Sequence, residues 1–213
     1  MALFARRPQT SNVSSLYTVG LNNTIAIIGL GNIGEKYTQT RHNIGFNCVD
    51  NFATTNEFPG WVLKKDIKAA ISTKTMGDSR VILMKPTTLM NLSGEAVMGL
   101  VQFYKIPATN ILVVHDELDV EFGKIRSRQG GSSAGHNGVQ SVIDAIGPDF
   151  SRLRIGIGPK TPEQIDSADF VLQKFTPKES KHLDALYLEI SAMINEYIFS
   201  DHSLLGETRS FII

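Results

Sequence analysis

Residues 111–119, with the sequence ILVVHDELD, constrain the fold of this chain more than any other stretch. The run from Ile111 to Val114 is apolar and mostly β-branched, which is typical of a strand buried on both faces in the middle of a parallel sheet. It stops at His115, and Asp116 follows. Ligands of open α/β sheets bind beyond the carboxyl ends of the central strands. We therefore expect the strand to end here and Asp116 to face a bound molecule.

Apolar patterns in the rest of the chain predict strands that alternate with helices. The expected strands are 24–28, 67–75, 80–84, 124–128 and 152–158, and the expected helices are 44–53, 90–104, 136–146 and 177–199. The short polar connection between 67–75 and 80–84 indicates a hairpin. The predicted fold class is a single α/β domain with a twisted, mixed, mostly parallel β-sheet flanked by α-helices.

Composition narrows the class of protein. The chain has 213 residues, enough for one α/β domain, and its apolar fraction of 42% can fill a core. Its 21 basic and 21 acidic residues cancel, so any contact with nucleic acid requires a local basic patch. Cys48 is the only cysteine, which excludes an internal disulfide and suits a reducing compartment. No apolar run approaches the roughly 20 residues of a membrane span, so no membrane partner is expected.

Residues 1–22 are expected to be an extension ahead of the domain. They contain Arg6, Arg7 and several serines but no acidic residue, a composition that resembles an organellar transit peptide. We favour a flexible bacterial extension and a cytoplasmic protein, and keep an organellar location as the alternative.

A glycine motif follows the first predicted strand. The sequence GLGNIG at 29–34 has the G-x-G-x-x-G spacing of dinucleotide-binding proteins. Its last glycine should open a helix, but residues 35–39 intervene. The acid at the expected offset, Asp50, lies in a helical pattern rather than at the end of a second strand. The hypothesis that this chain is a nicotinamide-dependent oxidoreductase is therefore supported only by three glycines.

Several polar residues lie where strands end or helices begin. They are Asn32, His42, Asn43, Asn91, Asp116, His136 and Asn137. No Cys/His cluster has zinc-site spacing, and no G-x-S-x-G elbow is present. A histidine oriented by a carboxylate can take a proton from water, and amides can position a carbonyl or hold an oxyanion. Each residue also has a structural explanation, because Asn commonly caps helices and Asp and His commonly close turns.

Cations are concentrated between residues 122 and 160. This part of the chain has six Lys and Arg residues and two acids, an excess of four positive charges in a neutral protein. Alternation places Lys124, Arg126 and Arg128 on one face of a strand, and Arg152 and Arg154 alternate in the same way. Such a stripe serves either as a solvated sheet edge or as a phosphate-binding surface.

Six segments in this order resemble the bacterial-type peptidyl-tRNA hydrolases. They are GLGNIG at 29–34 with Tyr37, TRHNIGF at 40–46, KPTTLMNLSG at 85–94, HDELD at 115–119, GHNG at 135–138 and RLRIGIG at 152–158. The resemblance covers residues 24–200 and implies a hydrolase domain over 23–213. It implies a monomer that needs no metal or cofactor and cleaves the ester between peptide and tRNA, so that tRNA returns to translation.

The resemblance also implies a role for individual residues. His42 matches the catalytic histidine, Asp116 the acid that assists it, and Asn32 an amide beside them. The matching substrate residues are Asn91 and Asn137 for the ester and attacking water, Tyr37 and Met90 for the peptide or the tRNA 3′ end, and Arg128 and Arg154 for the tRNA 5′-phosphate. The chain departs from the family in its N-terminal extension, in Ser and Ala within the loop 130–135, and in its apolar C-terminus. A non-catalytic RNA-binding module remains the alternative from another functional class.

Overall fold

The computed structural model describes residues 23–200 and 206–211, so the predictions for residues 1–22 and for the last two residues lie outside it. The strands are β1 (Asn23–Gly29), β2 (Val62–Lys64), β3 (Ala69–Met76), β4 (Ser79–Pro86), β5 (Ile111–Glu121), β6 (Lys124–Gln129), β7 (Ser151–Gly158) and β8 (Thr208–Ser210). The α-helices are α1 (Ile44–Thr55), α2 (Ser93–Tyr104), α3 (Asn137–Ile146), α4 (Ser167–Val171), α5 (Pro177–Ser180) and α6 (Leu183–Phe199). Short 3₁₀ helices are η1 (Glu35–Tyr37), η2 (Arg41–Asn43), η3 (Met90–Leu92) and η4 (Ala108–Asn110).

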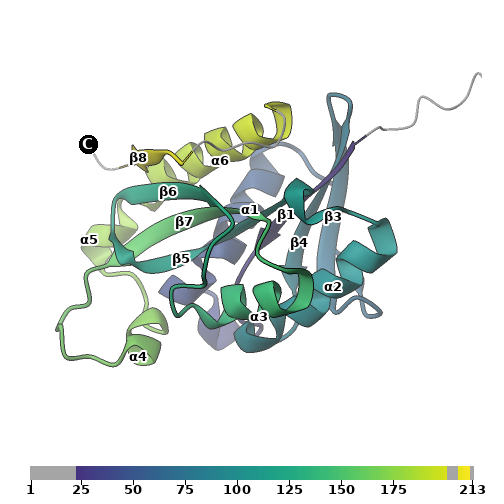
Figure 1. Cartoon of the computed structure of the whole chain (residues 1–213). Helices are drawn as coiled ribbons and strands as arrows, with labels where there is room; N and C mark the ends of the chain where they lie inside the picture. The colour runs from purple at the N-terminus through teal and green to yellow at the C-terminus, as the bar shows by residue number, and fades with distance from the viewer. Residues whose placement is uncertain (1–22, 201–205, 212–213) are drawn as a thin grey trace, which may run out of the picture.

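The strands form one mixed sheet in the order β2-β3-β4-β1-β5-β7-β6-β8 (Figure 1). The neighbours β4, β1, β5 and β7 pair in parallel, and the outer pairs are antiparallel. The mixed α/β sheet is thus confirmed, but parallel pairing is confined to these four central strands. The pairing of β3 with β4 is antiparallel because a tight turn joins the two strands.

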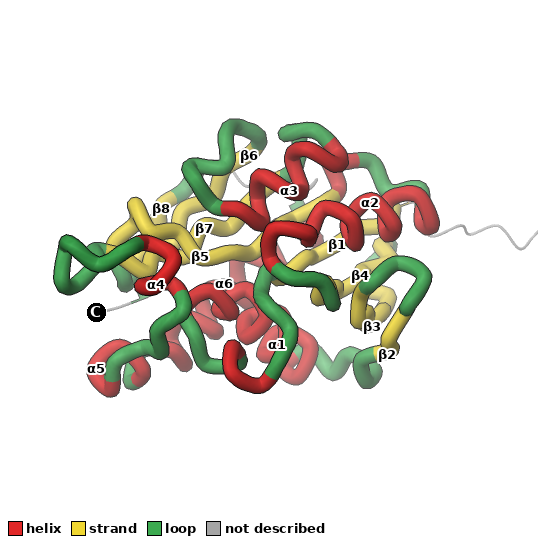
Figure 2. The backbone as a smooth tube through the Cα atoms, turned by 90° about the horizontal axis from the view of Figure 1, so that it is seen from below, coloured by secondary structure: helices red, strands yellow, loops and turns green. Residues whose placement is uncertain are grey.

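Helices cover both faces of the sheet, which gives three layers (Figures 1 and 2). Alternate residues of each central strand face opposite sides. Ile25 and Ile27 of β1 pack with α1 and α6, whereas Ala26 and Ile28 pack with α2 and α3. Burial on both faces explains why β1 and the start of β5 read as continuous apolar runs. No helix among the described residues is both long enough and apolar enough to span a bilayer.

Two predicted boundaries were wrong. β5 does not end at His115 but continues to Glu121, because its polar end still pairs with β7 across an irregularity between Glu117 and Glu121. The predicted helix 177–199 is interrupted by a turn at 181–182 and so forms α5 and α6, and a capping box of Thr176 and Glu179 fixes the start of α5. Asp116 consequently lies within a paired strand rather than at the start of a loop.

Candidate active site

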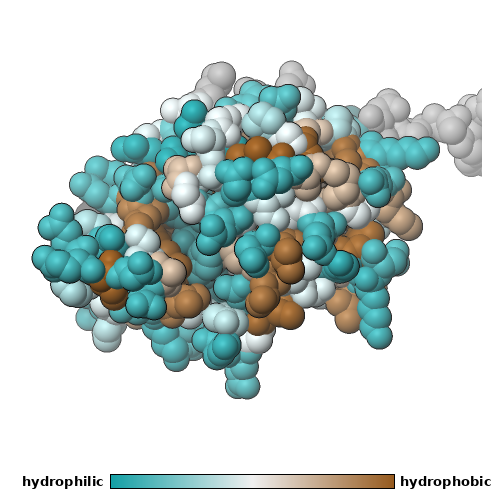
Figure 3. All heavy atoms as spheres, turned by 60° about the horizontal axis from the view of Figure 1, so that its bottom comes forward, coloured by the Kyte–Doolittle hydropathy of each residue, from teal (hydrophilic) through white to brown (hydrophobic). Residues whose placement is uncertain are grey.

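A cleft of about 630 Å³ opens at the carboxyl ends of β1 and β4 and beside the polar half of β5. Seven of the nine residues predicted from the sequence line it: Asn32, Tyr37, His42, Met90, Asn91, Asp116 and Asn137. The remaining lining includes Glu117, Leu118, His136 and the α4 region. Apolar patches interspersed with polar side chains mark this side of the molecule (Figure 3). Leu89 and Leu172, at the cleft, are 51% and 41% exposed.

Two glycines bring the histidine-bearing segment against the sheet. A Cβ on Gly45, at the start of α1, would lie 2.6 Å from the backbone nitrogen of Leu30 and would overlap the carbonyl of Val114. A Cβ on Gly29 would overlap the carbonyl of Gly45 in turn. The absence of side chains here lets α1 begin directly over β1 and β5. This contact sets the position of η2, and therefore of His42, relative to Asp116.

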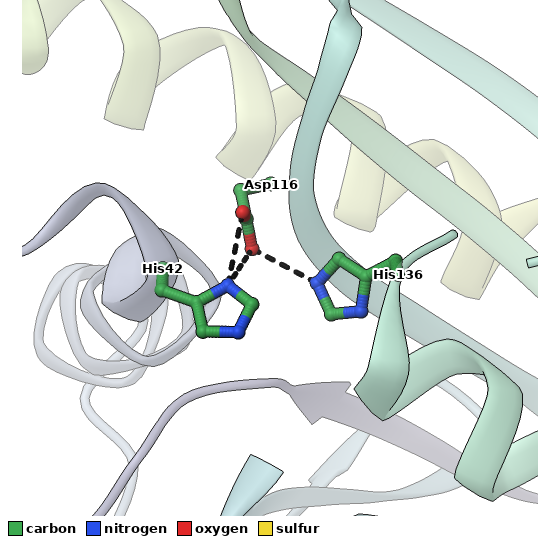
Figure 4. Close-up of side chains that lie close together, drawn as sticks. All are labelled: His42, Asp116 and His136. Atoms are coloured by element: carbon green, nitrogen blue, oxygen red, sulfur yellow. Dashed lines mark hydrogen bonds and ion pairs between the residues drawn. The ribbon is translucent and has the colours of Figure 1, made fainter. Parts of the chain in front are cut away.

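Asp116 joins two histidines from different parts of the chain (Figure 4). Nδ1 of His42 lies 3.0 Å from both carboxylate oxygens of Asp116. Nε2 of His136, the N-cap residue of α3, lies 3.0 Å from Oδ1 of the same carboxylate. Asp116 is 2% exposed, so its charge is compensated almost entirely by these two rings. The arrangement leaves Nε2 of His42 pointing away from Asp116.

The electrostatics of the pair favour an ionised acid beside a basic imidazole. Burial lowers the pKa of His42, but the charge of Asp116 and its hydrogen bond outweigh that effect and raise the pKa above its ordinary value of 6.5. Burial alone would raise the pKa of Asp116, but the two histidines hold it well below its usual range. Asp116 is therefore a carboxylate at neutral pH, and neutral His42 donates from Nδ1 and offers the lone pair of Nε2.

The hydrogen bonds of His136 fix the position of its proton. Its Nδ1 accepts from the backbone nitrogens of Gly138 and Val139 at 3.1 and 3.2 Å. The proton of the neutral ring is therefore on Nε2, which donates to Asp116. His42, Asp116 and His136 have the donor types of a metal site. A metal at Nε2 of His136 would displace this proton while Nδ1 still faces two N–H donors, so the hydrogen bonds fit a proton network better than a metal site.

Buried amides shape the floor of the cleft. Asn43 donates from Nδ2 to the carbonyl of Asn32 and accepts at Oδ1 from its backbone nitrogen, both at 2.9 Å. Oδ1 of Asn32 accepts from the backbone nitrogen of Met90 at 2.8 Å. These contacts leave the Nδ2 group of Asn32 as the part that can donate to a bound molecule. Asn91 and Asn137 are exposed at the edges of the cleft.

The two predicted phosphate-site arginines, Arg128 and Arg154, lie outside the cleft lining. Arg154 is connected to it, because its Nε donates to Glu117 at 2.9 Å. Arg152 lies between them: it pairs in register with Arg128 and is two residues before Arg154. Arg152 is 2% exposed, and burial together with the charges of Arg128 and Arg154 lowers its pKa to about 10. Its guanidinium donates to the carbonyls of Ser132 and Gly131, so it holds the loop that leads to His136.

Sequence reasoning named His136 and Asn43 as polar residues but gave them no function. The signal for His136 was its position directly before Asn137, after a glycine-rich loop, which structural explanations also fit. Asn43 follows His42 directly and ties that segment to Asn32. Glu117 and the α4 wall carried no recognisable signal, since their place at the cleft depends on the continued strand and on a five-residue helix.

Known proteins match this chain in sequence and in fold. A family model described as peptidyl-tRNA hydrolase matches residues 26–208. The chain is 45% identical over 172 residues to a peptidyl-tRNA hydrolase of Fervidobacterium nodosum, covering 81% of this chain and 87% of that protein. It is 46% identical over 160 residues to a chloroplastic peptidyl-tRNA hydrolase of Arabidopsis thaliana, covering 74% of this chain and 54% of that one.

A solved structure agrees with these sequence matches. The crystal structure of peptidyl-tRNA hydrolase from Acinetobacter baumannii superposes with a TM-score of 0.72 and 35% identity, over 83% of this chain and 91% of that one. The matches span the sheet, the cleft and the cationic strands, and they exclude the oxidoreductase suggested by the glycine motif. The chain belongs to the peptidyl-tRNA hydrolase family.

Proposed function

We propose that this hydrolase cleaves the ester of peptidyl-tRNA with a water molecule that His42 activates and Asp116 orients. The observation that carries the proposal is the 3.0 Å contact between Nδ1 of His42 and both oxygens of the buried Asp116. This contact fixes the ring orientation and places the basic lone pair on Nε2. His136 donates to the same carboxylate and holds it in place.

The reaction needs no covalent intermediate on the protein. The water oxygen attacks the ester carbonyl while its proton moves to Nε2 of His42. The tetrahedral intermediate then expels the ribose oxygen, which takes the proton back from the imidazolium, and the products are a peptide carboxyl group and a free tRNA hydroxyl. Asp116 remains ionised and stabilises the imidazolium while it exists.

The amide side chains at the cleft are suited to binding the ester and not to transferring the proton. Nδ2 of Asn32 can donate to the carbonyl oxygen as its negative charge develops. Asn91 and Asn137, which also line the cleft, can hold the water and the ribose, and Tyr37 and Met90 line the space for the peptide or the tRNA 3′ end. We place the enzyme in the cytoplasm as a monomer. An organellar location would depend on residues 1–22, outside the described part of the chain.

The pH dependence of cleavage tests the proposal directly. Only neutral His42 can accept a proton, so kcat/KM should rise with pH through the pKa of His42 and level off above it. Because Asp116 raises this pKa, the midpoint should lie above 6.5. The measurement is the rate of N-acetyl-aminoacyl-tRNA cleavage from pH 5 to 9, with the His42 ring titrated by NMR in parallel. A rate that is flat across this range would exclude His42 as the base.

We also propose that Arg128 and Arg154 bind the 5′-phosphate of tRNA. Arg128 is exposed, with its guanidinium against the backbone of Gly131. Arg154 uses Nε for Glu117, which leaves its terminal nitrogens for a phosphate. Replacing Arg154 alone would remove the ion-pair partner of Glu117, a buried carboxylate that is 4% exposed. Arg128 is therefore the cleaner position for a test.

Arg128→Ala should raise KM about tenfold for a 5′-phosphorylated substrate, since one charge-assisted contact is lost. The same substrate with a 5′-hydroxyl should be cleaved equally by wild type and variant. Arg80→Ala is the matched control, because Arg80 lies at the amino end of β4, opposite the cleft, and stacks on Tyr104. An equal loss on both substrates would assign Arg128 to the structure of the loop instead.

A further inference from the structure

Arg41 precedes His42 in η2, yet it does not line the cleft. The residue is only 3% exposed, which is unusual for an arginine. Removing a guanidinium from water this completely is costly unless the surrounding groups compensate its charge. The identity of those groups indicates what Arg41 does.

The contacts of the Arg41 guanidinium go to one segment, residues 170–179. One terminal nitrogen donates to the carbonyl of Lys174, and the other forms an ion pair with Glu179 at 2.8 Å. The guanidinium carbon lies 4.6 Å from the ring centre of Phe170 in α4 and 5.3 Å from that of Phe175. Ion pairing and stacking together use both the charge and the flat faces of the group.

The backbone beside Arg41 joins the same segment. The backbone nitrogen of Arg41 donates to the carbonyl of Gln173 at 2.9 Å, and Thr40 forms an isolated antiparallel bridge with Lys174. Arg41 therefore connects the turn that carries His42 to the chain around α4 through main-chain and side-chain contacts.

The chain that leads into this segment, residues 166–172, forms one wall of the cleft. Its lining residues are Asp166, Ser167, Ala168, Val171 and Leu172. Figures 1 and 2 show α4 on a loop that extends beyond the layers of the fold, and its main contact with another element is with η2. The position of the wall relative to the catalytic histidine therefore depends on the contacts of Arg41.

The chemistry of the wall fits a peptide better than nucleic acid. Its lining residues are small or apolar apart from one acid, Asp166, and they include no cation. A phosphate backbone would meet negative charge there, whereas peptide groups could pack against Ala168, Val171 and Leu172. A cluster of five cations instead lies on β6 and β7, in the half of the sheet that ends in β8.

We propose that Arg41 is a positioning residue that holds the α4 wall at a fixed separation from His42, and that this wall binds the peptide part of the substrate. The inference rests on the proposed role of His42, since the separation matters for the residue that activates water. Arg41 acts through two neighbours: it places the ring of His42 for the attack, and it keeps the wall in place before the peptide arrives.

The experiment compares Arg41→Met and Arg41→Lys on two substrates, an N-acetyl-aminoacyl-tRNA and a tRNA that carries a peptide of five residues. Met fills the volume of the aliphatic stem but removes the guanidinium. With the wall in place only part of the time, KM for the longer substrate should rise about tenfold, and KM for the shorter one should change much less. A displaced His42 should lower kcat on both, on the order of 10²-fold. Lys should recover part of both losses.

Two further variants separate positioning from stability. Glu179→Gln keeps the hydrogen bond to the Thr176 backbone but removes the charge beside Arg41, so it should shift KM for the longer substrate in the same direction by a smaller factor. Arg209→Met is the matched control, because Arg209 has ion pairs with Glu189, Glu196 and Glu207 away from the cleft. It should lower the melting temperature and leave both KM values unchanged.

The result that overturns the inference is a folded Arg41→Met enzyme with wild-type kinetics, or one with the same KM change on both substrates. If Arg41→Met fails to fold, Arg41→Lys and Glu179→Gln must still raise KM more for the longer substrate than for the shorter one, by a smaller factor. Otherwise the inference fails. The proposed role of His42 fails separately: it is rejected if His42→Ala cleaves the shorter substrate at the wild-type rate, whatever the Arg41 variants do.

Discussion

His42→Ala is expected to slow cleavage of N-acetyl-aminoacyl-tRNA by 10²–10⁴-fold, the usual contribution of a general base. The variant removes the lone pair that accepts the water proton, while Asp116 keeps its hydrogen bond to His136. KM should change little, because the amides and apolar walls that bind the substrate remain. The measurement is steady-state cleavage with the melting temperature recorded alongside.

A matched control and chemical rescue make this result specific. His182, the N-cap residue of α6, lies outside the cleft lining, and His182→Ala should cleave at the wild-type rate. Imidazole added to His42→Ala should restore part of the lost rate, since a free base can enter the space left by the ring. Wild-type cleavage by His42→Ala would reject the mechanism, and a loss that imidazole cannot relieve would point to a structural role.

Asp116→Asn is expected to have the largest effect, a loss of kcat on the order of 10⁴-fold. The carboxylate accepts from both His42 and His136, whereas an amide has one oxygen and brings an N–H group of its own. An N–H directed at Nδ1 of His42 favours the tautomer with the proton on Nε2, and that tautomer cannot take a proton from water. The size of the substituted side chain is nearly unchanged, so the loss reports chemistry rather than packing.

The same variant should move the pH profile in a defined direction. The carboxylate raises the pKa of His42, so its removal should lower that pKa. The residual activity of Asp116→Asn should therefore begin to fall at a lower pH than that of the wild type. Asp119→Asn serves as the control, because Asp119 is exposed on the same strand and does not line the cleft. An unshifted profile in Asp116→Asn would show that the carboxylate does not act on His42.

The predictable parts of this fold were those with a local cause. Strands β1 and β5 could be predicted from the sequence because burial on both faces requires uninterrupted apolar runs. Helix α3 could be predicted because a glycine ends it. The end of β5 was not evident, because its polar residues pair with β7, which lies 30 or more residues later in the chain. Pairing partners at that distance leave no trace in the local pattern.

The site divides in the same way. His42 and Asp116 follow from motif resemblance, and their contact spans 74 residues. The hydrogen bond from His136 depends on how Arg152 holds the loop 130–136, and the cleft wall depends on Arg41 and a five-residue helix. Such contacts join side chains that the sequence shows only as isolated polar residues, each with an ordinary structural explanation.

The pairing of β5 with β7 fixes the distance between two groups of the enzyme. In that pairing His115 is in register with Arg154, and Asp116 is the next residue along β5. Under the proposed assignments, the carboxylate that orients His42 and one phosphate-binding cation are thus carried by adjacent hydrogen-bonded strands, so the sheet fixes their separation. The sheet therefore sets the distance between the catalytic carboxylate and the proposed 5′-phosphate site, and this distance does not depend on the length of the attached peptide.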